Sequence, residues 1–355
     1  MKLGIIGLPQ SGKTTLFNAL TRATQPTGIT GKIEVHTAVV DVPDGRVDKL
    51  SVMFQPKKTI YAKVTYADIA GLDGSTSKSG IAGTLLNNLT QMDGFIHVVR
   101  AFEDENVPHP SGSVDALRDL SAMDSEFLLN DLIAVERRLE KLTEEKKKGA
   151  GRDKSVIDRE VELFNRFHET LSQDKLLRDL TLSVEEEKML AGFGFLSRKP
   201  VLVVINLSEG QKEPVVNYDH LHSQVVALQA KLEMDIAQLP PEEAAMFLQE
   251  YGITEPSLNR MIRLSYDLLG LQSFFTVGPD EVRAWTTHRG ATAPEAAGEI
   301  HTDLQKGFIR AEVVSYDDLM TLGGMNEAKA KGRLRLEGKE YIVLDGDILN
   351  IRFNL

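Results

Sequence analysis

The sequence predicts an α/β fold that is built on a parallel β-sheet, is interrupted by a helical insertion and is followed by a small α+β module. Several apolar runs have the length of buried strands, and helical or loop segments separate them. Near-continuous apolar runs of this kind are typical of parallel strands that are covered on both faces. The expected strands lie at residues 39–42, 64–67, 95–99 and 201–205.

The strand pattern stops between residues 126 and 194, where a helical seam replaces it. Apolar residues recur at 4-3-4-3 spacing on both sides of a polar stretch, 144–154, that contains Gly149 and Gly151. Two helices with such seams, joined by a glycine-bearing turn, predict an antiparallel helical hairpin inserted before the strand at 201–205. The seam positions are Leu128, Leu132, Val135, Leu139 and Leu142, then Ile157, Val161, Phe164, His168 and Leu171.

Basic side chains gather at the tip of this expected hairpin, and acidic ones lie among them. A local positive end on an acidic protein can contact RNA phosphate, and a solvated loop without a partner is the alternative. We interpret His168 as a polar residue tolerated near the hairpin base rather than as a ligand. The tip carries Lys146, Lys147, Lys148, Arg152 and Lys154 beside Glu144, Glu145 and Asp153.

The pattern changes again near residue 271, which predicts a separate module. Strands are expected at 274–277 and 282–286, and a helix at 294–300. A terminal hairpin is expected from strands at 341–344 and 349–353, joined by an Asp-Gly-Asp turn. The predicted domains are therefore a nucleotide domain at 1–125 and 195–270, a helical hairpin at 126–194 and a C-terminal module at 271–355.

The composition excludes several classes of function. The chain of 355 residues has no cysteine, so disulfides, thiolate metal sites and thiol catalysis are excluded, which fits a reducing cytoplasm. A net charge of −11 argues against general attraction to nucleic acid, so we expect no DNA partner. No apolar run approaches the ~20 residues of a membrane span, and the first strand leaves no room for a signal peptide. We therefore expect a cytoplasmic protein without a membrane partner.

Residues 7–14 form the most informative motif, because they match the phosphate-binding loop G-x-x-x-x-G-K-[ST]. A short apolar run precedes the loop as a strand, and a helical pattern follows it. The glycines let the backbone N–H groups turn toward an anion, and the helix N-terminus adds positive potential. Lys13 is expected to reach the β- and γ-phosphates, and the Thr14 hydroxyl to ligate Mg²⁺. The expected nucleotide contacts here are Gly7, Leu8, Pro9, Gln10, Ser11, Gly12, Lys13, Thr14 and Thr15.

A second motif, Asp68-x-x-Gly71, follows the expected strand at 64–67. Asp68 is expected to hold Mg²⁺ through water, and the Gly71 N–H to meet the γ-phosphate. The next residue, Leu72, occupies the position at which Ras-like enzymes have a glutamine that orients the attacking water. Leucine has no donor or acceptor, so either hydrolysis is very slow or another group positions the water.

A base-reading motif is expected after the strand at 201–205. The chain reads Asn206-Leu207-Ser208-Glu209 where a guanine reader has N-K-x-D. Glu209 is one methylene longer than the aspartate that accepts hydrogen bonds from guanine, and Leu207 replaces the lysine that covers the base. A site that hydrogen-bonds a particular group of its substrate discriminates strongly in favour of that substrate. Without this geometry, the site is expected to lose its preference for guanine. We expect ATP to bind at least as well as GTP.

Together these motifs resemble the YchF / Obg-like ATPase family of P-loop proteins, and the resemblance covers nearly the whole chain. It extends through residues 98–103 and is most marked in three C-terminal runs. Those runs are Gly278-Pro279-Asp280-Glu281-Val282-Arg283-Ala284-Trp285-Thr286, Ala297-Gly298-Glu299-Ile300-His301-Thr302-Asp303 and Gly307-Phe308-Ile309-Arg310-Ala311-Glu312.

The resemblance implies a GTPase-like domain that hydrolyses ATP in preference to GTP with Mg²⁺, a coiled-coil insertion and a C-terminal TGS domain of the β-grasp fold. It also implies association with the ribosome, through rRNA and ribosomal proteins, for which the hairpin and the TGS domain are the expected surfaces. The family's water-positioning histidine matches His109, and Lys13 is the other expected catalytic residue. The neutral imidazole can accept a proton from water; a surface loop histidine is the alternative.

The chain also departs from the family pattern. Gln10-Ser11 stands where the family usually has Asn-Val, and that asparagine is linked in related GTPases to potassium-assisted hydrolysis. In the first switch, Lys32 replaces a threonine, and residues 73–78 of the second switch are altered. Two other functions stay open: a GTP-binding translation factor of the Obg type, and a nucleotide-gated adaptor that does not hydrolyse.

Overall fold

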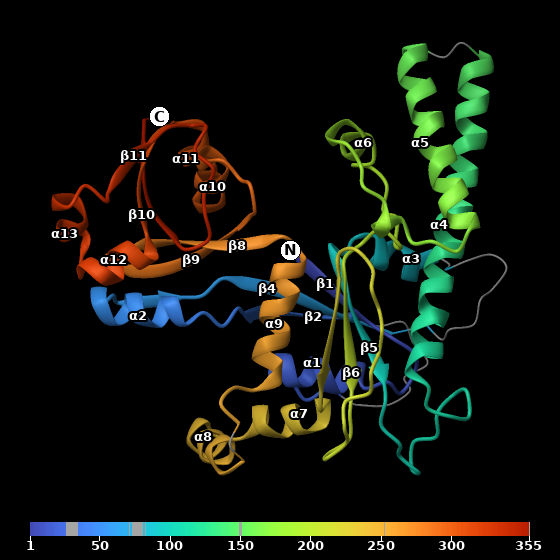
Figure 1. Ribbon diagram of the computed structural model, residues 1–355, viewed down its shortest axis with the longest axis horizontal. Coiled ribbons are helices and arrows are strands. Elements are labelled where there is room, and N and C mark those ends of the chain that lie inside the picture. The colour runs from blue at the N-terminus through green and yellow to red at the C-terminus, as the bar shows by residue number, and fades with distance from the viewer. Residues whose placement is uncertain are drawn as a thin grey trace. The chain divides into compact units, whose positions relative to one another are not determined.

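The structure is a computed structural model of the chain, and it describes residues 1–25, 35–70, 72, 81, 83–148, 151–251 and 253–354. The chain divides into two compact units (Figure 1). The first unit contains Met1–Ala38 and Thr65–Leu258, and the second contains Val39–Val64 and Asn259–Leu355.

The first unit is organised around a six-stranded sheet with the strand order β2-β4-β1-β5-β6-β7. The pairs β1–β4, β1–β5, β5–β6 and β6–β7 are all parallel, which confirms the predicted α/β class. Every residue of β5 and β6 is buried, as their apolar sequences predict. The strands are β1 (Lys2–Ile6), β2 (Val35–Asp41), β4 (Lys63–Ile69), β5 (Gly94–Arg100), β6 (Val201–Asn206) and β7 (Ser223–Leu228).

Helices cover this sheet. The first turns of α4 pack on it together with α3, and the rings of Phe95 in β5 and Phe127 in α4 lie 5.2 Å apart. Elsewhere α1 packs against α7. The helices of this unit outside the hairpin are α1 (Lys13–Thr21), α3 (Gly83–Thr90), the 3₁₀ helix η1 (Leu177–Asp179), α6 (Val184–Met189), α7 (Ala230–Gln238) and α8 (Pro241–Glu250), while α9 (Ser257–Leu268) leads into the second unit.

The predicted helical hairpin is present, as α4 (Ala116–Lys148) and α5 (Lys154–Ser172) run side by side in Figure 1. The helix α4 starts ten residues before the predicted insertion, so one continuous helix joins the core of the first unit to the hairpin tip. Lys146, Lys148 and Arg152 at the tip have acidic partners. Arg138 and Arg152 both pair with Glu160 at 2.7 Å, and Lys146 pairs with Asp158 at 2.6 Å.

The predicted seam on α5 is wrong at His168. Its side chain is 43% exposed and lies 3.6 Å from Glu136, whereas the neighbouring Phe167 is fully buried. The buried face follows Ile157, Phe164, Phe167 and Leu171. A straight helix has 3.6 residues per turn, so its apolar face drifts away from a strict 3.5-residue seam.

The second unit has a mixed six-stranded sheet in the order β11-β10-β12-β8-β9-β3. Phe274, Phe308, Val313 and Leu349 pack from this sheet against the alanine-rich face of α10, which confirms an α+β module. The elements are α2 (Gly45–Phe54), β3 (Lys58–Ile60), β8 (Leu271–Val277), β9 (Glu281–His288), α10 (Ala293–Ile300), α11 (Thr302–Lys306), β10 (Phe308–Ser315), α12 (Tyr316–Leu322), α13 (Met325–Ala330), β11 (Arg335–Glu337) and β12 (Asp347–Phe353).

The predicted terminal hairpin is wrong. Residues 341–344 form no strand apart from one isolated bridge between Ile342 and Thr292, and β12 pairs instead with β10 and β8. The buried Asp347 explains the difference, because its carboxylate accepts hydrogen bonds from the Leu344 N–H and the Tyr341 hydroxyl. These bonds hold the Asp-Gly-Asp segment as a loop.

The segment Val39–Val64 groups with the C-terminal residues, although the predicted domain limits assign it to the nucleotide domain. Strand β3 pairs with β9, and Arg46 in α2 binds Asp345 at 2.7 Å and lies over the Phe275 ring at 5.1 Å. The compact division also leaves the hairpin inside the first unit. The division into three domains therefore stays a prediction.

Candidate nucleotide-binding site

The phosphate loop connects β1 to α1, as predicted, and two glycines fix its shape. Gly7 has φ 147°, and a Cβ there would lie 2.3 Å from the Val98 carbonyl oxygen. Gly12 has φ 98°, and a Cβ there would lie 2.3 Å from the side-chain nitrogen of Asn206. Residues other than glycine rarely adopt such φ values, and an added Cβ would overlap with neighbouring atoms at both positions. The loop can therefore approach a ligand with its backbone alone.

The other loop residues line or support this turn. Leu8 is buried in the apolar core, and Gln10 also has a positive φ, of 62°. Ser11 is buried, and its Oγ has no hydrogen-bond partner among the described residues. Pro9 and Thr15 are half-buried, and Thr15 lies in the first turn of α1. Because Gly12 caps α1 without a side-chain hydrogen bond, the N–H groups of that turn stay available to an anion.

The Lys13 ammonium lies across the phosphate loop. Its Nζ donates to the carbonyl oxygens of Gly7, at 2.9 Å, and Leu8, at 2.8 Å. Burial lowers the pKa of Lys13 to about 8, and the nearby Asp68 carboxylate opposes this shift. A half-buried cation that donates hydrogen bonds to carbonyl oxygens is suited to receive a phosphate, which supplies stronger, charged acceptors.

The two predicted metal ligands lie together. The Thr14 hydroxyl donates to Oδ2 of Asp68 at 2.9 Å, and Asp68 is only 5% exposed. Burial raises the pKa of Asp68, and the bond from Thr14 and the charges of Lys13 and His36 oppose the rise. Oδ1 of Asp68 is buried without a hydrogen-bond partner among the described residues.

This pair fits Mg²⁺. The Thr14 hydroxyl and the Asp68 carboxylate supply hard oxygen donors. Oδ1 of Asp68 can bind a cation without first breaking a hydrogen bond to a described residue. In residues 1–25, 35–70, 72, 81, 83–148, 151–251 and 253–354, no group of three or more acidic or histidine side chains could hold a metal ion. Mg²⁺ typically takes one or two protein oxygens and completes its shell with phosphate and water, so a two-ligand site suits it.

Asn206 connects the base-reading motif to the phosphate loop. Its Nδ2 donates to the Ser11 carbonyl oxygen at 3.0 Å, and its Oδ1 accepts from the Ala230 N–H at 3.0 Å. Leu207 is half-buried against the apolar core of the first unit, and Glu209 is exposed. The asparagine thus holds the loop, β6 and the start of α7 in one arrangement.

The predicted γ-phosphate contact at Gly71 lies outside the described residues, as do Lys32 and the altered positions 73–78. Leu72 is described, and it is 3% exposed within the apolar core of the first unit. Leu72 therefore has no group that could position water, which agrees with the expectation drawn from its place in the sequence.

The predicted catalytic His109 is not on the phosphate loop. It lies between β5 and α4, and its described hydrogen-bond partners are Asp119, Ser111 and Arg118. The structure therefore joins the phosphate loop, the Thr14–Asp68 pair and Asn206, and holds His109 in a separate cluster.

Arg100 is a structural residue that the sequence motifs do not single out, and it organises the loop that leads to His109. The buried guanidinium donates to the carbonyl oxygens of Phe102, at 3.0 Å, and Val107, at 2.7 Å, and stacks on the Phe102 ring. The only signal in the sequence is a charged residue that ends an otherwise apolar strand. Asp119, the partner of His109, carried no signal, because His109 lies in a loop and Asp119 in α4, so no single period relates them.

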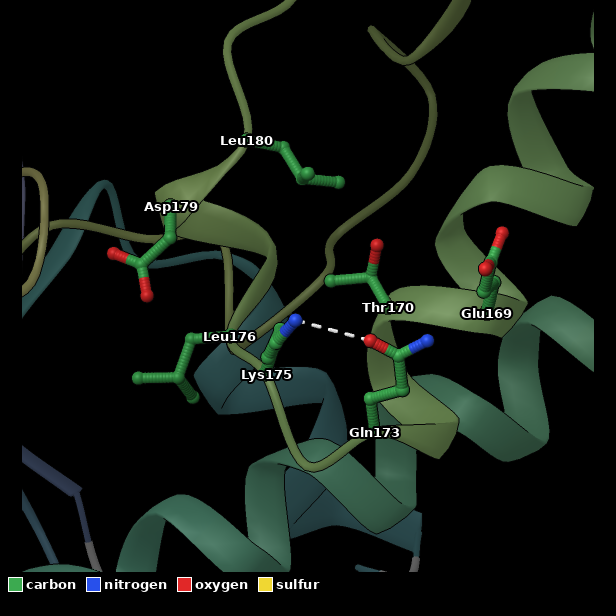
Figure 2. A pocket seen from close by; sticks show the side chains of 7 residues that line it. All are labelled: Glu169, Thr170, Gln173, Lys175, Leu176, Asp179 and Leu180. Carbon is green, nitrogen blue, oxygen red and sulfur yellow. Dashed lines mark hydrogen bonds between the residues drawn. The ribbon is translucent and has the colours of Figure 1, made fainter.

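A separate cavity of about 290 Å³ lies at the base of the hairpin (Figure 2). Its lining is mixed, and Lys175 donates to Gln173 at 3.0 Å within it. None of the predicted nucleotide-site residues lines this cavity. The lining residues are Glu169, Thr170, Gln173, Lys175, Leu176, Asp179 and Leu180.

The fold and the site define a P-loop nucleotide-binding protein of the GTPase type. Residues 2–138 match the family model described as 50S ribosome-binding GTPase, and residues 271–354 match the YchF-GTPase C-terminal model, described as a protein of unknown function.

Full-length relatives complete the assignment. The chain is 40% identical to the ribosome-binding ATPase YchF of Bacillus subtilis, with 99% of each chain covered, and 41% identical to that of Escherichia coli O157:H7, with 100% of this chain and 99% of that one covered. The solved structure of the Schizosaccharomyces pombe YchF GTPase matches with a TM-score of 0.84 and 31% identity, over 99% of this chain and 97% of that one. The chain belongs to the YchF family, which confirms the resemblance.

Among the helices in the described part of the chain, none has both the length and the apolar character that crossing a membrane requires.

Proposed function

We propose that this protein is a molecular switch that binds and hydrolyses ATP and acts on the ribosome. The observation that carries the proposal is the joined site: the phosphate loop, Lys13 and the Thr14–Asp68 pair, linked through Asn206 to a base corner without a guanine-reading aspartate. Relatives that align over the whole chain are named ribosome-binding ATPase, which supports both parts of the proposal.

The preference for ATP over GTP follows from the base corner. Leu207 offers an apolar surface to a purine and no hydrogen bond, and Glu209 is exposed beyond it. The N1–H and 2-amino group of a guanine base would meet no aspartate placed to accept their hydrogen bonds. Adenine has neither group. Unpaired polar groups in a binding site weaken affinity, so guanine loses its usual advantage.

Each residue of the site has a distinct task. The Lys13 ammonium would leave the loop carbonyls for the β- and γ-phosphates, and the N–H groups around Gly12 would hold the phosphate chain. Thr14 and Asp68 would hold Mg²⁺, which when bound offsets phosphate charge. Because Leu72 is apolar and buried, we assign the orientation of water to His109, whose ring nitrogens must first leave their present partners.

For ribosome contact we propose the hairpin and the C-terminal module. The hairpin supports this role because α4 and α5 extend away from the sheet of the first unit (Figure 1). Lys146 and Arg152 at its tip pair with acids, so recognition depends in part on shape and on local rearrangement of these pairs. We therefore also propose a cytoplasmic location, which the proposed ribosome partner supports.

Single-turnover hydrolysis, measured for the full chain with ATP and with GTP, tests the proposal. We expect phosphate release from ATP, with faster release when ribosomes are added, and co-sedimentation with ribosomes that differs between ADP and a non-hydrolysable ATP analogue. Release from GTP alone supports the Obg-type factor. No phosphate release under either condition, with nucleotide-dependent co-sedimentation retained, supports the adaptor.

A further inference from the structure

A buried histidine–aspartate pair lies at the start of the hairpin helix. Nε2 of His109 is 2.9 Å from Oδ2 of Asp119, and the two side chains are 3% and 4% exposed. Arg118 completes the cluster, because its guanidinium donates to Oδ1 of Asp119 at 3.0 and 2.8 Å. Such a shielded, charge-assisted group holds its members in one geometry.

The hydrogen bonds also fix the form of the imidazole. The Ser111 N–H donates to Nδ1 of His109 at 3.1 Å, so this nitrogen is an acceptor. Nε2 therefore carries the proton and donates it to Asp119. Arg118 also approaches Nδ1, to 3.4 Å, which again favours a lone pair there. Both ring nitrogens are occupied, and neither can accept a proton from water.

The position of Asp119 connects this pair to the hairpin. It lies in the first turn of α4, and the same uninterrupted helix continues to Lys148 at the tip. Further along α4, Asp124 binds the Tyr218 hydroxyl and Asp131 accepts from the Ser197 N–H, so the helix is anchored to the first unit at several points. A partner that binds the hairpin and moves α4 therefore also moves the Asp119 carboxylate that binds His109.

We propose that Asp119, supported by Arg118, is a positioning residue that restrains His109 in an orientation unable to act on water, and that ATP hydrolysis requires release of this bond. The inference rests on the catalytic role of His109 in the proposed function. It assigns a regulatory contact to the base of the hairpin, where a partner that moves α4 controls the rate of hydrolysis without touching the nucleotide.

The test is single-turnover ATP hydrolysis by full-length variants, with ATP affinity and melting temperature measured alongside. Asp119→Ala removes the acceptor of Nε2–H, and we expect the rate to rise about tenfold, the ratio given by ~1.4 kcal/mol. ATP affinity should stay within about twofold. Asp119→Asn keeps the volume and one neutral acceptor, so an intermediate rise is expected and folding is preserved. Ser125→Ala, which alters an exposed hydrogen bond within α4, serves as the matched control and should leave the rate unchanged.

The same series in a His109→Ala background separates a restraint from a general loosening. If Asp119 acts through His109, the increase disappears there. An unchanged or lowered rate in Asp119→Ala and Asp119→Asn overturns the proposal, and so does an increase that persists without His109. If His109→Ala alone hydrolyses as fast as the unmodified protein, the assignment of His109 in the proposed function is wrong instead.

A spectroscopic measurement on the unmodified protein is independent of these variants. Nitrogen-15 NMR of the histidine rings distinguishes a protonated Nε2 from a protonated Nδ1. We expect His109 to carry its proton on Nε2 in the absence of nucleotide, and the Nε2 signal to shift in Asp119→Ala, where that N–H loses its carboxylate acceptor. A protonated Nδ1 in the unmodified protein would contradict the restraint.

Discussion

Replacing Gly12 with alanine should destroy the phosphate site, and the structure sets the magnitude. The new Cβ would lie 2.3 Å from the Asn206 amide nitrogen, so that side chain must move and lose its 3.0 Å bond to the Ser11 carbonyl. The φ of 98° adds about 1–2 kcal/mol of strain for a side chain. The broken bond adds about 1–3 kcal/mol, because the carbonyl is left unpaired. The total is about 2–5 kcal/mol.

Calorimetric titration with MgATP and a thermal melt would measure this effect. If the loop relaxes to remove the overlap, the cost appears as lost affinity, of about 30-fold to 4 × 10³-fold at 1.4 kcal/mol per factor of ten. Gly290→Ala is the matched control, because Gly290 also has a positive φ, of 85°, but no atom lies within 4 Å of the added Cβ. Strain alone should lower its melting temperature slightly and leave ATP binding intact. Normal affinity in Gly12→Ala would refute the steric argument.

Four further predictions concern single side chains of the site. Lys13→Ala should abolish tight ATP binding in calorimetry, since the phosphates lose their cation. Phosphate binding must raise the lowered pKa of Lys13, about 8 in the free protein, so ATP affinity should be constant below pH 8 and fall as the pH rises through it; a flat profile to pH 10 would count against this assignment. Asp68→Asn should reduce the gain in ATP affinity on adding Mg²⁺ by about tenfold, and an unchanged gain would exclude Asp68 as a ligand. His109→Ala should slow hydrolysis ~10²-fold with ATP affinity retained, as expected for loss of a general base.

The parts of the fold that the sequence predicted are those with strong local signals. Strands β5 and β6 are mostly apolar and buried throughout, and the phosphate loop is defined by glycines whose φ values and close contacts allow no other residue. Each of these signals resides in a short stretch of chain, so no partner needs to be known. The hairpin was predictable for the same reason, because its apolar repeat is local.

The errors and omissions arise where distant residues decide the structure. Strand β3 pairs with β9 across more than 200 residues, so nothing local shows that Val39–Val64 groups with the C-terminal residues. Asp347 binds Leu344 and Tyr341 rather than closing a hairpin. Within the site, the roles of Asn206 toward the loop and of Asp119 toward His109 depend on side-chain contacts that no periodicity reveals.

Calorimetric titration of the folded, full-length protein with ATP and with GTP, in the presence of Mg²⁺, tests the central claim most directly. The site described here predicts saturable binding of ATP, with a dissociation constant equal to or below that of GTP. Absence of heat with adenine nucleotides, or a strong preference for guanine nucleotides, would contradict it.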